Sequence, residues 1–189
     1  MAGGYKFSNE PQEVLREYYK VGTEERLSSG ANLMNDGLGY VMTCAPLNVD
    51  FEKREATLCF RARVASLDES GDTTIKYGCG IKSGMFISDG KTAFEVKDVK
   101  VSGDNYTIVG CKFAVDAIIF EVKDAEGKTP KDTPNALNYG VTPCDSSESV
   151  SVLIRAYEIK NNKLYSPLLP SDIEALGGNM GRYFFLNRK

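Results

Sequence analysis

The chain has 189 residues, of which 42% are hydrophobic and 26% charged, with a formal net charge of −3. This length suits one substantial core, and the small net charge gives no electrostatic reason to expect a nucleic-acid partner. The apolar runs are too short and too charged to cross a membrane, and no signal peptide precedes them, so we expect a soluble chain made in the cytoplasm.

Residues 1–47 are predicted to form an N-terminal arm with one or two short helices. Pro11 stands at the start of a helix-forming run over residues 12–19, and Gly22 ends this run. A second short helix is predicted over residues 23–27, with Thr23 as its cap. We expect this arm to pack on a neighbouring subunit.

Residues 48–189 are predicted to form one β-sandwich domain, because their apolar residues recur with a period of two. The clearest run is 57–64, where Leu58, Phe60, Ala62 and Val64 share one face. Further strands are predicted at 75–81, 85–87, 94–101, 106–109, 117–122, 150–156 and 182–186. Many short strands without alternating helices predict a mainly β protein: an antiparallel β-sandwich, Ig-like or jelly-roll-like, with the short N-terminal helical arm.

Two connections between these strands are predicted from composition. Turn-forming residues at 160–163 indicate a hairpin that joins the run 150–156 to residues 164–166, with Tyr157 and Tyr165 as cross-strand neighbours. Residues 124–149 are rich in Lys, Asp, Pro, Ser and Thr, so this stretch is predicted to be a long, exposed polar loop.

The composition argues against catalysis. Histidine is absent, which removes Ser-His-Asp and Cys-His arrangements, histidine-ligated metal sites and the usual general base near neutral pH. The adjacent carboxylates Asp68 and Glu69, and the pair Asp124 and Glu126, sit in turn-like polar segments, where solvated loop acids are the better interpretation. We therefore expect no enzyme.

No cofactor or metal site is predicted either. The segment 78–84 superficially resembles a phosphate-binding loop, but no helix pattern follows it, so its glycines are better explained by a bend or a close backbone approach. No loop places acidic residues at the offsets that a calcium ion requires. The five cysteines are widely spaced and odd in number, which favours buried thiols over disulfides.

Aromatic and apolar residues near the two ends of the chain are the candidate partner contacts. The C-terminal run is unusually apolar for a terminus, so it is either a last strand of the sheet or a docking segment. The candidates come from the first helix, the predicted hairpin and this C-terminal run: Val14, Leu15, Tyr18, Tyr19, Tyr157, Tyr165, Tyr183, Phe184 and Phe185.

The strand runs 58–64, 76–81 and 152–157, followed by Leu164-Tyr165-Ser166-Pro167, resemble an Ig-like pattern found in surface proteins of gut Firmicutes and in virion proteins of their phages. The resemblance covers roughly residues 56–167. It implies a non-catalytic module, and the absence of a predicted signal peptide favours a virion protein over a cell-surface protein.

These observations lead to ranked expectations. The first is a non-catalytic structural protein, a phage virion component of the capsid decoration, neck or tail, that self-assembles or joins a larger particle through protein contacts. The alternative is a surface-displayed module that binds a glycan or a protein through aromatic side chains and the loop 124–149. A carboxylate enzyme is the least favoured.

Overall fold

The computed structural model describes residues 30–153, 155–178 and 183–186. Strands dominate these residues, so the prediction of a mainly β protein is confirmed. The helices predicted within residues 1–29 lie outside the described part. No helix among the described residues is long and apolar enough to cross a membrane.

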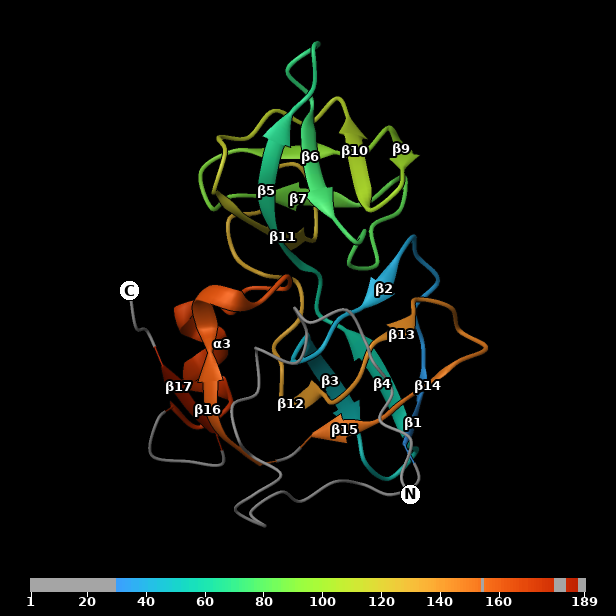
Figure 1. Cartoon of the computed structure of the whole chain (residues 1–189), viewed down its shortest axis with the longest axis vertical. Coiled ribbons are helices and arrows are strands. Elements are labelled where there is room, and N and C mark those ends of the chain that lie inside the picture. The colour runs from blue at the N-terminus through green and yellow to red at the C-terminus, as the bar shows by residue number, and fades with distance from the viewer. Residues whose placement is uncertain (1–29, 154, 179–182, 187–189) are drawn as a thin grey trace, which may run out of the picture.

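The first sheet lies in the lower part of Figure 1. Its order is β14-β1-β4-β3-β12-β15, and its two outer strands, β14 and β15, are separated along the chain by Ser151 alone. The sheet therefore curves back on itself like a small barrel. Its strands are β1 (Ala31–Leu33), β3 (Pro46–Asp50), β4 (Glu55–Leu58), β12 (Ala136–Asn138), β14 (Ser149–Val150) and β15 (Val152–Leu153). A separate two-stranded ladder pairs β2 (Tyr40–Val41) with β13 (Thr142–Pro143).

The second sheet forms the upper body of Figure 1 and is inserted between β4 and β12. Its order is β8-β7-β11-β5-β6-β10-β9, and only Val96 and Lys97 separate the outer strands β8 and β9 along the chain. This sheet also curves round, so that residues 93–102 pair with β7 at one end and with β10 at the other. Its strands are β5 (Arg61–Leu67), β6 (Thr73–Lys76), β7 (Phe86–Ser88), β8 (Ala93–Glu95), β9 (Asp98–Ser102), β10 (Asn105–Val109) and β11 (Ile118–Val122).

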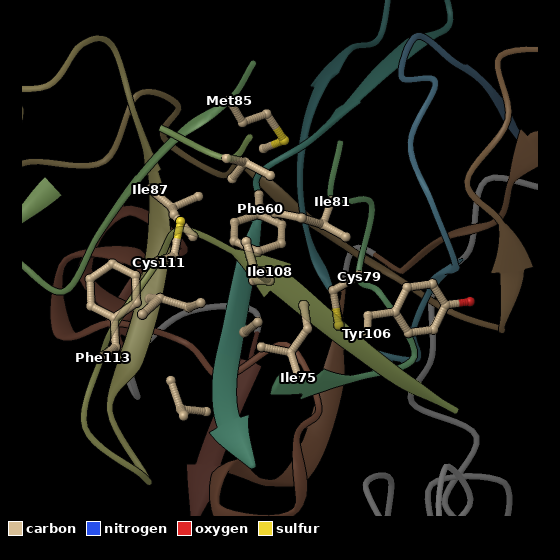
Figure 2. Packing of buried hydrophobic residues seen from close by; sticks show 14 of the residues in the cluster. Phe60, Ile75, Cys79, Ile81, Met85, Ile87, Tyr106, Ile108, Cys111 and Phe113 are labelled. Carbon is tan, nitrogen blue, oxygen red and sulfur yellow. The ribbon is translucent and has the colours of Figure 1, made fainter. Parts of the chain in front are cut away.

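Each sheet encloses its own apolar core. The face predicted for residues 57–64 is confirmed, since Leu58, Phe60, Ala62 and Val64 are all buried. The run nevertheless serves two sheets: Leu58 ends β4 and packs in the first core, while Phe60 enters the second. Figure 2 shows Phe60 near the middle of the second core, with Ile81, Ile87 and Ile108 around it.

The C-terminal part covers the outer face of β12 and β15. It consists of β16 (Ala156–Lys160), a 3-10 turn η1 (Asn161–Lys163), the helix α3 (Pro170–Ala175) and β17 (Tyr183–Leu186). Leu137 and Leu153 point away from the first core and join a third cluster, which contains Leu164 and Leu176. The last predicted strand is thus confirmed as β17.

The connections differ from the sequence-based expectations. β16 pairs in parallel with β17, and not in a hairpin with residues 164–166, because the third cluster favours the distant strand. β1 also pairs in parallel with β4, so the first sheet is mixed, whereas the second sheet is antiparallel throughout.

Two predicted segments take other forms. Residues 31–47 form β1, β2 and the start of β3 within the folded body, where an arm was expected. The predicted polar loop 124–149 contains β12, whose residues are all buried. Three residues are too short to show a period against their polar flanks.

Candidate functional site

The structure places the predicted contact residues in different environments. Tyr183 and Phe185 are buried in the third cluster, and the Tyr183 hydroxyl donates a hydrogen bond to the Leu153 carbonyl. These two side chains are therefore core residues and not a contact surface. Their strand was identified from its apolar composition, which serves a core and an interface equally well.

The remaining predicted contacts do not meet in one patch. Tyr165 is half-buried, and its ring lies 4.6 Å from the Tyr77 ring in an edge-on arrangement, so it belongs to the packing between segments. Tyr157 and Phe184 lie in β16 and β17, and their side chains are outside the described ones. The candidates in the predicted first helix are likewise outside the described residues: Val14, Leu15, Tyr18 and Tyr19.

A different apolar surface is visible between β1 and β2. Met34, Leu38 and Tyr40 lie within a stretch of seven residues and are 53%, 41% and 42% exposed. Large apolar side chains at such exposure, close together in one segment, are typical of contact surfaces, and tyrosine is enriched among residues that dominate binding energy. Segment 34–40 is therefore the candidate functional site.

Hydrogen bonds hold the backbone of segment 34–40 at both ends. The Met34 N–H donates to the Ala56 carbonyl at 2.8 Å, and the Tyr40 N–H donates to the Tyr77 carbonyl at 2.9 Å. Between them, Leu38 donates to the Ile81 carbonyl at 2.7 Å and accepts from the Gly80 N–H at 3.1 Å. The apolar side chains are thus displayed on a backbone that is already ordered.

Glycines permit the close approach that these bonds require. A Cβ atom on Gly39 would lie 2.0 Å from the Tyr77 carbonyl oxygen, and one on Gly37 would lie 2.3 Å from the Gly80 carbonyl oxygen. On the opposing segment, the four consecutive residues Tyr77, Gly78, Cys79 and Gly80 all have positive φ. Of the glycines in segment 78–84, Gly78 therefore permits the backbone approach that the sequence indicated, because a Cβ atom on it would lie 2.5 Å from the Leu38 carbonyl oxygen.

Segment 34–40 also carries a polar group among its exposed apolar residues. The exposed carboxylate of Asp36 accepts a hydrogen bond from the Ser146 N–H at 2.8 Å, and this bond is the main reason why the pKa of Asp36 is lowered. Lys82 lies close enough to lower the pKa further. Protein contacts commonly combine apolar side chains with polar groups in this way.

The most strongly bonded polar group of the described residues is a buried ion pair that joins the second sheet to α3. The Arg61 guanidinium donates to both carboxylate oxygens of Asp172, at 2.9 and 2.8 Å, and to the carbonyls of Phe60 and Asp132. Arg61 and Asp172 are 1% and 2% exposed. With four hydrogen bonds from the guanidinium to protein oxygens and both side chains buried, this pair serves to fix the structure.

The cysteine thiols and possible metal ligands are the other groups with potential reactivity. All five cysteines are unpaired and buried, and desolvation raises the pKa of Cys59, Cys79 and Cys111 to about 12 and that of Cys144 to about 11. Buried thiols of this kind are unreactive. Among the described residues, no group of His, Cys, Asp and Glu side chains is arranged to hold a metal ion.

The acid pairs considered from the sequence build turns. The Asp68 carboxylate accepts the N–H groups of Ser70 and Asp72, and the Asp124 carboxylate accepts the Glu126 N–H. Such bonds are local turn interactions. Both acid pairs therefore lie in turns, as the sequence predicted.

Comparisons with known proteins add no relative. No protein-family model, no curated protein and no solved structure matches the chain. Segment 34–40 was missed in the sequence because it lies within the stretch assigned to the arm. The available signal was the alternation of glycine with large apolar residues in Gly37-Leu38-Gly39-Tyr40.

Proposed function

We propose that this protein is a non-catalytic assembly protein that works by holding other protein chains together. The single observation that carries the proposal is segment 34–40, where Met34, Leu38 and Tyr40 are exposed on a backbone hydrogen-bonded to β4 and to the connection between β6 and β7. Binding through such a segment loses little conformational entropy, because the backbone is ordered before the partner arrives.

The proposal extends to the kind of assembly. A virion component of a phage, in the capsid decoration, neck or tail, fits a small mainly β chain with a preformed apolar contact. The resemblance of residues 56–167 to Ig-like modules of virion proteins supports the same assignment, and an Ig-like or jelly-roll-like relationship of the sheets belongs to this proposal. The partner is another protein of the particle.

Gradient sedimentation tests the proposal. Lysates of cells that produce the chain together with the rest of its native assembly are separated on a sucrose gradient, and the chain is detected in each fraction. We expect the wild type in the fast particle fraction and the variant Leu38→Ser with Tyr40→Ser at the top of the gradient. Leu67→Ser with Val115→Ser is the matched control, since these residues are 45% and 50% exposed at other sites.

Two results would contradict the proposal. One is wild-type protein that stays at the top of the gradient as a small species. The other is a control variant that leaves the particle as completely as the segment variant does, because general loss of surface apolarity would then explain both. Circular dichroism of each purified variant confirms that it is folded.

A further inference from the structure

β9 is an outer strand with a long unpaired side. Among the described strands it pairs with β10 only, over residues 98–102, through a two-residue turn at Gly103 and Asp104. Gly103 has a φ of 57°, as the first position of a type II′ hairpin turn requires. The other outer strands of the two large sheets are shorter: β8 has three residues and β14 and β15 have two each.

The direction of the backbone groups follows from the pairing of β10. The Tyr77 N–H donates to the Asp104 carbonyl, so alternate residues of β10 from position 104 onward bond toward β6. Residues 105, 107 and 109 then bond toward β9, where they face residues 102, 100 and 98. The N–H and C=O groups of Val99 and Val101 consequently point away from β10, toward the unpaired side.

The side chains along this unpaired side are suited to a partner strand. Val101 is 53% exposed, and Asp98 and Lys100 are both exposed on the opposite face of β9. The Val99 N–H, which points toward the unpaired side, donates a hydrogen bond to the Asp98 carboxylate at 2.8 Å. This bond is local, so a hydrogen bond to another chain can replace it.

We propose that a second copy of this chain pairs with this side of β9, strand against strand and antiparallel. The two-fold axis passes through Val99, so that Val99 faces Val99 of the second copy. Asp98 then lies opposite Lys100 of the second copy, and Lys100 lies opposite its Asp98. Opposite charges in directly facing positions stabilise an antiparallel pair.

The charge pattern selects this occupant and this register. Around Val99 the sequence reads Lys97-Asp98-Val99-Lys100-Val101, which is complementary to itself when reversed about Val99. Reversal about Lys100 would instead place lysine against lysine, which is unfavourable. The pairing is also isologous, as a two-fold dimer requires.

This inference goes beyond the proposed function, because it concerns a different surface and names the chain itself as partner. Sedimentation velocity of the purified full chain over a concentration series at low salt tests it. We expect a reversible monomer–dimer equilibrium. We expect Lys100→Asp and Asp98→Lys each to raise the dimer dissociation constant about tenfold, because each replaces attraction by repulsion in two symmetric pairs.

Mixing the two single variants tests the proposed register most directly. An equimolar mixture of Lys100→Asp and Asp98→Lys restores opposite charges in a heterodimer, and so does the double swap in one chain, so both should dimerise like the wild type. Lys123→Asp, the same charge change at an exposed site outside β9, is the matched control. All of these positions are exposed, so the fold is retained, which circular dichroism verifies.

Three outcomes overturn the inference: a wild type that is monomeric at every concentration, single variants that dimerise as the wild type does, and mixtures that stay monomeric when the wild type dimerises. The variant Leu38→Ser with Tyr40→Ser should dimerise normally in this assay. Failure of the β9 dimer therefore leaves the proposed function standing, and failure of the gradient experiment leaves the β9 dimer standing.

Discussion

Asp172→Asn removes one charge from the buried ion pair with Arg61 while keeping the size of the side chain. The guanidinium then retains its bonds to the Phe60 and Asp132 carbonyls but faces no countercharge at 1% exposure. Breaking a buried pair from one side costs about 3–5 kcal/mol, because the remaining charge stays desolvated. We expect this loss in the free energy of unfolding, measured by urea denaturation followed by circular dichroism.

A double-mutant cycle separates the pair from its surroundings. Arg61→Met combined with Asp172→Leu removes both charges and leaves the Phe60 and Asp132 carbonyls and the Leu169 N–H without their side-chain partners. Because no unpaired charge then stays buried, the double variant should lose less stability than Arg61→Met and Asp172→Leu lose in sum. We expect this difference to be about 0.5–3 kcal/mol.

Glu121→Gln is the matched control for this cycle. Glu121 and Lys131 form an ion pair at 2.7 Å, close to the 2.8 Å of the pair between Arg61 and Asp172, but the lysine side chain is 44% exposed. Such a pair contributes at most about 1 kcal/mol. If Asp172→Asn costs no more than Glu121→Gln, water reaches the Arg61 pair and the reasoning from burial is refuted.

The remaining predictions concern the glycine contact and the thiols. Gly39→Ala should destabilise the protein by at least about 2 kcal/mol more than Gly103→Ala in urea denaturation, because both residues have positive φ but only Gly39 meets a backbone oxygen; equal losses would contradict this. A thiol reagent at pH 8 should label the folded protein slowly and reach all five cysteines in guanidinium; rapid labelling of the folded chain would show that the thiols are accessible. The raised pKa of the buried thiols stabilises the fold fully below pH 9, so stability should fall as pH rises from 9 toward 12, and a flat profile in that window would argue against their burial.

Alternation of apolar residues predicted a large part of the fold. The inward face at Leu58, Phe60, Ala62 and Val64 follows from side-chain periodicity and the last strand from its apolar composition, and both are local properties. The buried state of the cysteines followed from their number and spacing.

Contacts between residues far apart in the sequence could not be predicted from the local alternation of apolar and polar residues. Arg61 stands between Phe60 and Ala62, so the alternation predicts it on the opposite, polar face of the strand. It is nevertheless buried, because Asp172, 111 positions away in the sequence, binds it. The parallel partner of β16 was missed because its choice depends on the packing of the third cluster. Segment 34–40 depends in the same way on Tyr77 and Ile81, which lie in the connection between β6 and β7.

Hydroxyl-radical footprinting with mass spectrometry tests the central claim, that segment 34–40 is the surface by which this protein joins an assembly. Met34 and Tyr40 are exposed and carry readily oxidised side chains, and Phe51, 43% exposed at the β3–β4 turn, is the internal reference. The proposal predicts that Met34 and Tyr40 are protected in the assembled particle relative to the free chain, while Phe51 is oxidised equally in both. Unchanged oxidation of Met34 and Tyr40 on assembly would contradict it.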